Sequence, residues 1–579
     1  MDASIGLQYM VTPNFGLAAF ARFTDYNTFT AGLGAVVEAS ANLGGASSPS
    51  SATSKPPENA PQQPKTSPKP LSTSAPGVEI VRLDLPPVFP VFYKFYDDHP
   101  MGTLVIRNNF PSALVNMSVK VYVKQYMDDP KEIDFSDALA PGDSKTLDLF
   151  ALFTNRVLDI TEGTKASAEI DLGFEVNGKA QEIKKIETVT FLGRNAMTWD
   201  DNRKAAAYVT AKDPAVLIFA RSITGYVRAK ETRSINVNLQ AAIALHEALD
   251  LYGLNYVPNP QTPYSVVSET KDRVDFLQFP RETFQYRAGD CSDISILYSA
   301  LLAAVAIDSA FITIPGHVFV AVSTGLTPDQ ARQILIPENQ FIEHENKAWI
   351  PVEITLRHQG FLKAWALGAK EWRENQAAGQ AGFYPVLEAW DAFQAVGLPG
   401  ADNGAPSVPS SEQVQTRYLS EMQKYIDQAT APEVSRLQSE IKKTGSVAAM
   451  NSLGVLYAKY GQSDNAEEQF TRALKQKTYL PAIINLGNLS FIKEDWAGAL
   501  RYYKQANDIA PGVPHVLLAL ARTDLELQNY NDARNVYEKL KKIDPVLADQ
   551  FSYLGESQNT GTRSADVEAE RLEVYWESE

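Results

Sequence analysis

The only cysteine of the chain lies where a thiol could act as a nucleophile. Cys291 follows Gly289 and Asp290 and directly precedes an apolar run at 294–306. Apolar side chains in this run recur at helical spacing, which predicts a helix that buries one face, with Asp290 as its N-cap and Cys291 in its first turn. The positive end of the helix macrodipole favours the thiolate, which is the nucleophilic form. The pattern therefore predicts a Cys291 pKa below that of a free thiol.

A histidine and a carboxylate follow in two apolar, strand-like segments. His317 lies within 311–322, and Glu353 lies within 349–355. Because side chains alternate along a strand, Glu353 is expected to point away from the buried side of its strand. A thiol, an imidazole and a carboxylate can form a triad, in which the imidazole takes the thiol proton and the carboxylate fixes the imidazole tautomer.

These segments carry a resemblance to the transglutaminase-like (papain-like cysteine peptidase) superfamily, over roughly residues 200–395. The matching motifs are FPRETF at 279–284, GDCSD at 289–293, PGHVF at 315–319 and WIPVEIT at 349–355. The resemblance implies a nucleophile at Cys291, a base at His317 and an orienting acid at Glu353. The family more often has Asp at the last position, so Glu353 departs from its pattern.

The resemblance also implies an oxyanion-hole side chain at Gln285, six residues before the cysteine, with Tyr286 as the alternative. A second interpretation of the same residues stays open, because a lone buried cysteine is usually an inert small side chain. In that case the domain folds but its site is silent. His344 and His358 match no common metal-ligand spacing, so the sequence predicts no metal and no cofactor.

Composition excludes some classes of function. The net charge is -16, with no clustered basic face, which argues against a nucleic-acid partner. One cysteine allows no intramolecular disulfide. The longest apolar run is too short to span a bilayer as a helix, and the N-terminus lacks the pattern of an export signal.

The first 45 residues predict three short strands rich in glycine and aromatic residues, at 6–11, 14–23 and 29–36. They resemble the closing hairpins of an outer-membrane barrel, which implies outer-membrane association and a periplasmic location. Three strands cannot close a barrel, so a poorly ordered extension and a start inside a longer reading frame remain alternatives. Residues 46–76 are rich in Pro, Ser and Thr and predict a disordered linker.

The two following domains differ in pattern. Residues 77–195 show short alternating strands, with a hairpin signal at Asn177-Gly178, which predicts an immunoglobulin-like β-sandwich. Residues 196–395 begin with helices and continue with the strands around His317 and Glu353, which predicts an α+β domain of the transglutaminase-like type.

The C-terminal part is helical and repetitive. A linker and helices are expected at 396–446, and three tetratricopeptide repeats at 447–547, because a leucine followed by glycine or alanine, at 453, 486 and 520, and aromatic residues recur at offsets of 33 and 34 residues. The concave face of such an array commonly binds an extended polypeptide. An acidic tail is expected at 548–579, and its part after about residue 555 is expected to be mobile.

Taken together, the sequence predicts a cysteine hydrolase or acyltransferase that acts on amide bonds of a protein or peptide and binds a polypeptide partner through its repeats. The alternative is a protein-interaction scaffold of the cell envelope, in which the transglutaminase-like fold is catalytically silent. Two of the three predicted domains are binding modules, which supports the scaffold.

Overall fold

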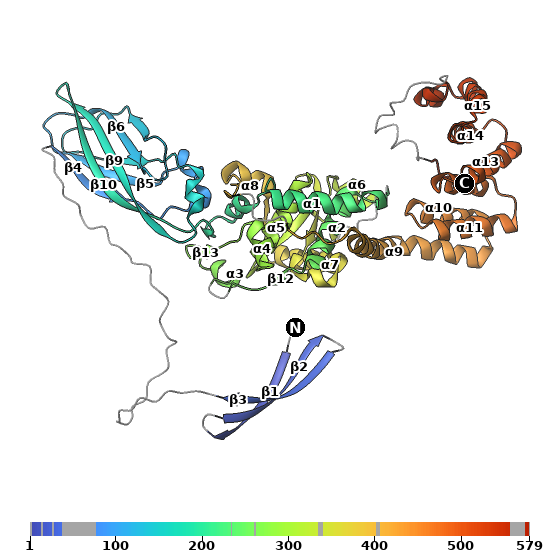
Figure 1. Cartoon of the computed structure of the whole chain (residues 1–579), viewed down its shortest axis with the longest axis horizontal. Coiled ribbons are helices and arrows are strands. Elements are labelled where there is room, and N and C mark those ends of the chain that lie inside the picture. The colour runs from blue at the N-terminus through green and yellow to red at the C-terminus, as the bar shows by residue number, and fades with distance from the viewer. Residues whose placement is uncertain are drawn as a thin grey trace. The chain divides into compact units, whose positions relative to one another are not determined.

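The computed structural model describes most of the chain (Figure 1). Backbone alone is described for three N-terminal strands, and side chains are described as well for six later ranges. These ranges are 77–232, 234–259, 262–332, 340–400, 406–555 and 574–577. The chain divides into two compact units, Met1–Ser67 and Pro68–Glu579.

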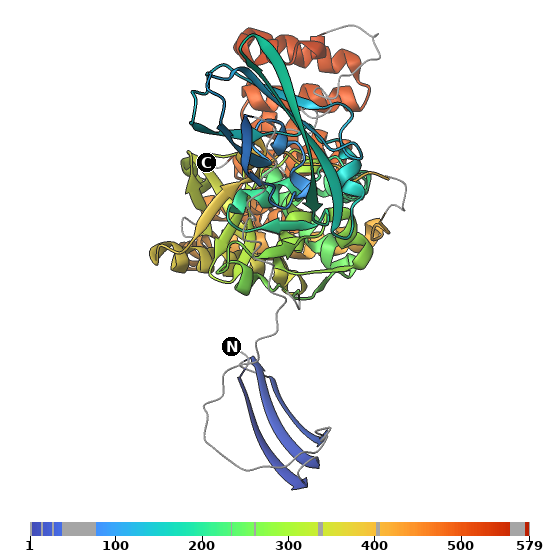
Figure 2. The same cartoon turned by 90° about the vertical axis from the view of Figure 1, so that its left-hand side faces the viewer.

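The first unit contains an antiparallel meander of three strands (Figure 2). The strands are β1 (Ala3–Thr12), β2 (Phe15–Asp25) and β3 (Thr28–Val37). Each strand predicted in this region falls on one of them. The linker predicted at 46–76 lies outside the described residues.

The second unit begins with two antiparallel sheets, in the strand orders β10-β9-β6-β7 and β4-β5-β8. The strands are β4 (Val78–Asp84), β5 (Gly102–Asn108), β6 (Val115–Tyr122), β7 (Lys131–Phe135), β8 (Ser144–Leu149), β9 (Thr164–Val176) and β10 (Lys179–Phe191). Buried and more exposed residues alternate along β9, as the pleat requires. The buried residues of both sheets belong to one hydrophobic core.

The predicted hairpin at Asn177-Gly178 is confirmed. These two residues join β9 to β10, and both have positive φ, 53° and 72°. A type I′ turn needs positive φ at both central positions, which asparagine and glycine tolerate best. The turn therefore sets the register of β9 and β10, the two longest strands of these sheets.

A five-stranded antiparallel sheet forms the centre of the next domain, in the order β17-β18-β16-β15-β19. Its strands are β15 (Ser309–Ile314), β16 (His317–Ser323), β17 (Ile342–His344), β18 (Lys347–Val352) and β19 (Gly382–Pro385). Two small pairs lie outside this sheet: β11 (Ala196–Thr198) with β13 (Val274–Phe276), and β12 (Asn255–Tyr256) with β14 (Ala288–Gly289). We refer to residues 196–395 as the central domain.

Helices surround this sheet. They are α1 (Pro214–Val227), α2 (Val237–Tyr252), α3 (Tyr264–Val267), α4 (Pro280–Tyr286), α5 (Cys291–Ala304), α6 (Pro328–Gln333), α7 (Phe361–Ala377) and α8 (Val386–Ala392). The 3-10 helices of the described residues up to this point are η1 (Pro90–Phe92), η2 (Phe95–Asp97), η3 (Asn155–Asp159), η4 (Asn202–Tyr208), η5 (Arg228–Lys230) and η7 (Ile354–Gln359).

Two expectations for the central domain are wrong. The helix at the cysteine was expected to bury one face, but every residue from Cys291 to Leu302 is buried, because α1, α2, α4 and β16 all pack against α5. The single strand predicted at 311–322 is a hairpin of β15 and β16, interrupted by the turn-forming pair Pro315-Gly316.

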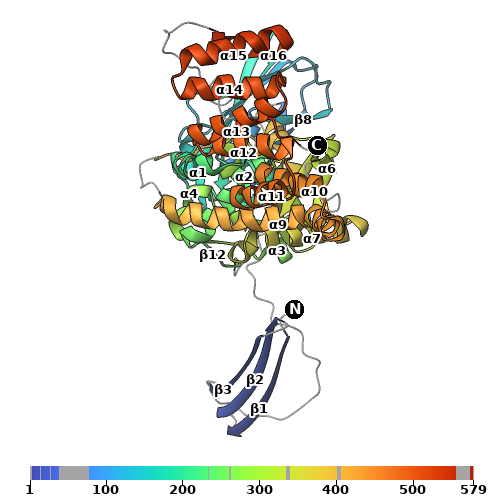
Figure 3. The same cartoon turned by 90° about the vertical axis from the view of Figure 1, so that its right-hand side faces the viewer.

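A long helix, α9 (Ser411–Thr444), connects the central domain to the repeats. Its first half packs on α2 and α1, and its last part packs on α10. Three helix pairs follow (Figure 3). They are α10 (Val447–Lys459) with α11 (Ser463–Gln476), α12 (Leu480–Ile492) with α13 (Trp496–Ile509), and α14 (Pro514–Glu526) with α15 (Tyr530–Ile543). The array then continues with α16 (Pro545–Gln550) and η8 (Ser552–Gly555).

Glycines allow the helices of each of the first two pairs to approach closely. A Cβ atom on Gly454 would lie 2.5 Å from the Phe470 ring, and one on Gly487 would lie 2.6 Å from the Tyr503 ring. Both contacts are far shorter than a van der Waals contact, so the absence of a side chain at these positions lets α10 pack on α11 and α12 on α13. The recurrence of glycine and an aromatic residue, from which the repeats are predicted, thus has a packing cause.

Among the described residues, no helix combines the length and the apolar character that crossing a membrane requires. The helical part continues through α16 and η8 to Gly555, and four residues of the part predicted to be mobile, Val574–Glu577, are bound to the repeats. For these four residues the expectation of a mobile tail is wrong, because their apolar and aromatic side chains have surfaces to pack against.

Candidate functional site

The predicted helix start at Cys291 is confirmed. The Asp290 carboxylate accepts hydrogen bonds from the backbone N–H of Ser292 at 2.8 Å and of Asp293 at 3.1 Å, and the Asp293 carboxylate accepts from the Asp290 N–H at 3.1 Å. This is a reciprocal capping box. A Cβ at Gly289 would lie 2.7 Å from the Cβ of Asp293, so glycine is needed before the cap. Cys291 occupies the first helical position and is 2% exposed.

A tight turn places His317 beside the start of α5. Pro315 and Gly316 form the two-residue connection between β15 and β16, and His317 is paired with Ile314 across it. Gly316 has φ of 73°, as the third residue of a type II turn requires, and proline suits the position before it. Because β16 packs on α5, the first residue of β16 lies near the helix N-terminus.

Glu353 lies just beyond β18 and caps η7. Its carboxylate accepts hydrogen bonds from the backbone N–H of Thr355 at 3.0 Å and from the Thr355 hydroxyl. The side chain is buried, with 2% of the residue exposed. This corrects the expectation that Glu353 points to the solvated side of a strand. Helix α7 covers β18 so closely that a Cβ on Gly368 would lie 2.7 Å from the carbonyl oxygen of Pro351.

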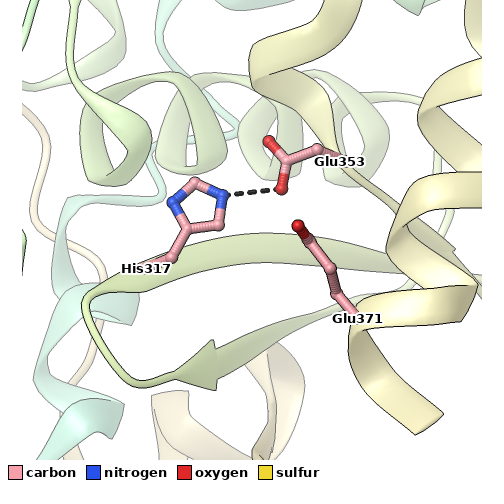
Figure 4. Close-up of side chains that lie close together, drawn as sticks. All are labelled: His317, Glu353 and Glu371. Atoms are coloured by element: carbon pink, nitrogen blue, oxygen red, sulfur yellow. Dashed lines mark hydrogen bonds and ion pairs between the residues drawn. The ribbon is translucent and has the colours of Figure 1, made fainter. Parts of the chain in front are cut away.

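The structure brings His317 and Glu353 into direct contact. The His317 Nε2 atom lies 2.6 Å from the Glu353 Oε2 atom (Figure 4). The carboxylate therefore holds the ring with Nε2 protonated, and Nδ1 is the nitrogen left for the thiol. Burial lowers the His317 pKa, but side-chain hydrogen bonds with Cys291 and Glu353 outweigh burial and raise the pKa to about 10. Glu353 thus binds the imidazole directly, and Cys291 lies near enough to influence its pKa.

The Cys291 pKa departs from the expected direction. Burial raises the pKa of the thiol, the hydrogen bond with His317 lowers it, and the nearby Asp290 carboxylate raises it again. The net effect is upward, so the expectation of a lowered pKa at the helix start is wrong. Desolvation acts on the full charge of the thiolate, whereas a helix N-terminus offers about half an elementary charge. Burial also raises the pKa of the Asp290 carboxyl group to about 6.

A second carboxyl group, Glu371, lies at the same site and was not predicted. One ligand atom each of His317, Glu353 and Glu371 lie within 4.8 Å of one another (Figure 4). Burial raises the Glu371 pKa to about 7, and the charge of Glu353 acts in the same direction. Glu371 belongs to α7, and the one sequence signal for its position is Gly368, one helical turn earlier, which lets α7 approach β18.

The structure does not bring Gln285 together with these residues. Gln285 is exposed near the end of α4 and lines a surface cavity with Arg287 and Ser407. Tyr286, the alternative, is 59% exposed. Helix α4 ends at Tyr286, and Arg287 reverses the chain in a left-handed conformation. For this reason neither Gln285 nor Tyr286 points to the thiol, although both precede it closely in sequence.

Another tyrosine, Tyr256, lies closer to the thiol. The parallel pairing of β12 with β14 places Tyr256 opposite Gly289. Burial raises the Tyr256 pKa to about 12, and the charges of Cys291, Asp290 and Glu353 contribute in the same direction. Its hydroxyl group stays protonated and can donate a hydrogen bond near Cys291. Sequence analysis missed it because the short strand β12 has no periodicity to detect.

Two further histidines, His344 and His358, lie apart from this site. His358 pairs with Asp250 at 2.5 Å. His344 lies close to Glu345 and Glu388, with ligand atoms within 4.8 Å of one another, and both carboxylates are exposed. Exposed acidic groups of this kind are common on protein surfaces, and neither histidine contacts Cys291, His317 or Glu353 in the described part of the chain.

Comparisons with known proteins address the C-terminal part. The family described as Tetratricopeptide repeat matches residues 491–551. Tetratricopeptide repeat protein 8 of Mus musculus is 29% identical over 103 residues, which cover 18% of this chain and 20% of the length of that protein. A solved structure described as "Functional Characterization of Pseudomonas Aeruginosa pilF" is 20% identical, with a TM-score of 0.19, covering 25% of this chain and 75% of that one. The chain therefore contains a tetratricopeptide repeat at 491–551, within its array of helix pairs.

Proposed function

We propose that the central domain is a transglutaminase-like cysteine hydrolase or acyltransferase that acts on amide bonds of a protein or peptide. The observation that carries this proposal is the linkage of three residues through one ring. Glu353 binds Nε2 of His317 at 2.6 Å, and the Cys291 thiol at a helix N-terminus lies close enough to the same imidazole for each to shift the pKa of the other. This arrangement supports the proposed roles of nucleophile, base and orienting acid.

In the proposed reaction, the thiol proton first moves to Nδ1 of His317, whose raised pKa favours the imidazolium, and Sγ of the resulting Cys291 thiolate then attacks the amide carbonyl carbon. The tetrahedral adduct collapses when the same proton passes from Nδ1 to the leaving nitrogen, which breaks the C–N bond and leaves a thioester on Cys291. Water or an amine then attacks the thioester, again with His317 as the base. Throughout, Glu353 stabilises the imidazolium and keeps the ring oriented.

The oxyanion requires hydrogen-bond donors near the thiol. The backbone N–H of Cys291 lies at the first position of α5, where the helix itself provides no acceptor for it. We assign the second donor to the Tyr256 hydroxyl instead of Gln285, because Tyr256 lies near Cys291 and keeps its proton. Removal of one such donor typically lowers turnover by about two to three orders of magnitude.

The remaining parts would deliver or hold partners. Tetratricopeptide repeats generally bind polypeptides, so the array is proposed to bind a protein partner of the enzyme. The strand orders of the two N-terminal sheets of the second unit support an immunoglobulin-like sandwich in the role of a spacer. The glycine- and aromatic-rich strands β1–β3 support a place in the envelope of a bacterium, with outer-membrane association and a periplasmic location.

A second function, a non-catalytic envelope scaffold, is favoured by one specific observation. Burial raises the pKa of the Cys291 thiol, so much of it stays protonated at neutral pH. An inert thiol would leave the repeats as the main functional surface. The two functions differ in whether His317 changes the reactivity of Cys291.

The test is alkylation of Cys291 by iodoacetamide over a range of pH, followed by intact mass. Because burial raises the Cys291 pKa, we expect the pH midpoint of the reaction to lie above that of free cysteine. Because His317 lowers the Cys291 pKa, the midpoint should rise further in His317→Ala. An activated thioester substrate should then leave an acyl group on Cys291, and Cys291→Ala should show neither adduct. A midpoint that His317→Ala leaves unchanged, with no acyl adduct, would favour the scaffold.

A further inference from the structure

The inner helices of the repeats carry buried amide side chains that need hydrogen-bond partners. Asn451 of α10 and Asn485 of α12 are fully buried, and Asn488 of α12 is 3% exposed. An unpaired buried amide costs about 1–3 kcal/mol, so such residues are rarely retained in a helix bundle without a partner. The surface of α10, α12 and α14 around these three asparagines is called the groove below.

Their partner is the backbone of the C-terminal segment Val574–Glu577, called the tail segment below. Asn488 Nδ2 donates to the Tyr575 carbonyl at 2.7 Å. Asn485 binds Glu577 twice, with Nδ2 donating to its carbonyl at 2.7 Å and Oδ1 accepting from its N–H at 2.9 Å. Asn451 Nδ2 donates to the same carbonyl at 2.8 Å. The amides thus bind the main chain at two residues of the tail segment.

Side chains of the tail segment pack on different repeats. The Trp576 ring stacks on Phe470 of α11, with centroids 6.4 Å apart, and the Tyr575 ring stacks on His515 of α14 at 4.5 Å. Val574 packs against the core formed by the second and third helix pairs, whereas Trp576 packs against that of the first and second. Successive residues of the tail segment therefore bind successive positions along the array.

The groove holds its amides in fixed orientations. The Tyr503 hydroxyl donates to Asn488 Oδ1 at 2.8 Å, which turns the Asn488 amide nitrogen toward the tail segment. Asn485 Nδ2 also donates to Asn451 Oδ1 at 2.9 Å, so Asn451 likewise presents its nitrogen. These donors come from residues of the array itself. The groove is thus organised to bind an extended main chain, and its apolar contacts select aromatic side chains.

We propose that this groove is the partner-binding site of the array, that it accepts an extended segment with two adjacent aromatic residues followed by an acidic one, and that the chain's own tail segment occupies it in cis. A partner segment of this chemistry then binds only after it displaces the tail. The tail is joined to the array through the 18 residues 556–573. A connection of this length gives an effective concentration on the order of 1 mM, so competition in cis is strong.

The test uses a fluorescent peptide with the sequence of residues 571–579, RLEVYWESE, and measures fluorescence anisotropy. We expect it to bind a chain shortened to residues 1–555 at least about tenfold more tightly than the full chain, because the shortened chain lacks the competitor. In the full chain, the double variant Tyr575→Ala, Trp576→Ala should bind the peptide as the shortened chain does. This second variant leaves every residue of the array unchanged.

Asparagine variants of the shortened chain test the contacts. Asn485→Ala should weaken peptide binding at least about tenfold, because it removes both hydrogen bonds to Glu577. Asn465→Ala, at an exposed position of α11, is the matched control and should bind normally. Equal affinity of the full and shortened chains, or no binding to either, would overturn the proposal. Dimers of the full chain that dissociate when the tail is removed would overturn occupancy in cis.

Discussion

Three ionisable side chains and a thiol meet at the central site of Cys291, His317, Glu353 and Glu371, whereas uncharged amides bind the tail segment in the groove of the repeats. At the central site, burial raises the pKa values of Cys291 and Glu371, whereas interactions with Cys291 and Glu353 outweigh burial and raise the pKa of His317. In the groove, every hydrogen bond described between the asparagines and the tail segment joins an amide to a main-chain group. The central site therefore depends on the protonation of its side chains, and the groove on hydrogen bonds between uncharged groups.

This difference fits the role proposed for each site. Proton transfer at neutral pH needs groups whose pKa values are moved by burial and by neighbouring charges. Recognition of a main chain needs donors and acceptors in fixed places, and charge would only add a desolvation cost. A change of charge should therefore affect the central site alone, and a change of packing the groove alone.

Glu353→Gln should have the largest effect. The amide replaces the carboxylate that binds Nε2 of His317. The imidazolium therefore loses its counter-charge, and the neutral ring is no longer held in the tautomer with Nε2 protonated. Turnover of an activated thioester or amide substrate should fall by about three to four orders of magnitude, with folding preserved. Glu353→Asp should cost less. Peptide binding by the groove should stay unchanged in both. Full activity in Glu353→Gln, with Cys291→Ala inactive, would leave a Cys-His dyad.

Gly487→Ala should damage the groove instead. The new Cβ would lie 2.6 Å from the ring of the buried Tyr503, whose hydroxyl orients Asn488. Overpacking of this kind costs about 1–3 kcal/mol, measured as the free energy of unfolding of the array in urea. Peptide affinity should fall with it, while alkylation of Cys291 stays the same. The matched control is Gly225→Ala, inside α1 with open space around it, which should stabilise by about 0.5–1 kcal/mol.

The parts of the molecule that can be predicted from sequence are those with local signals. The helix start at Asp290 and Cys291, the turn at Asn177-Gly178 and the periodic glycines of the repeats each follow from residue type at short spacing. Cys291 and His317 of the proposed triad are detectable because cysteine and histidine are rare in this chain, with 1 and 6 copies. These features do not need a three-dimensional structure to be found.

The parts that cannot be predicted depend on contacts between distant segments. Glu371 reaches the central site only because α7 packs on β18, and the Cys291 pKa is raised because α5 is buried on every side. The tail segment binds asparagines that precede it by 87 to 126 residues. Nothing in an acidic stretch or in a helical asparagine indicates this pairing. At both sites, the burial of side chains and the contacts between segments far apart in sequence are therefore what sequence reasoning cannot predict.

The pH dependence of stability should distinguish the two sites. The His317 pKa is raised from 6.5 to about 10 in the folded state, so its stabilising contribution is full below about pH 6.5 and is lost as the pH rises toward 10. Part of this pKa shift comes from Cys291, which keeps its proton over part of this range. We therefore expect the unfolding free energy of the central domain to fall by an amount on the order of 2 kcal/mol between pH 7 and 9.5. His317→Gln should flatten this decline. The same decline in His317→Gln would contradict the assignment. Peptide binding should not follow it.

Glu371→Gln should have the smallest effect and should sharpen the comparison within the central site. Burial raises the Glu371 pKa from 4.5 to about 7, so the folded state holds this proton more tightly, and the unfolding free energy falls as the pH rises through that window. The side chain is partly exposed, and after discounting for solvent screening we expect Glu371→Gln to gain less than about 1 kcal/mol at pH 8 relative to pH 5. Glu374→Gln, an exposed position on the same helix, removes one charge and is the control. If the unfolding free energies of both variants shift equally between pH 5 and pH 8, the loss of one negative charge anywhere on α7 explains the effect. Glu371 is a positioning residue for Glu353 and His317 if three results coincide. The unfolding free energy shifts in Glu371→Gln alone, turnover changes with pH by less than about tenfold relative to the unmodified chain, and Cys291 is still acylated.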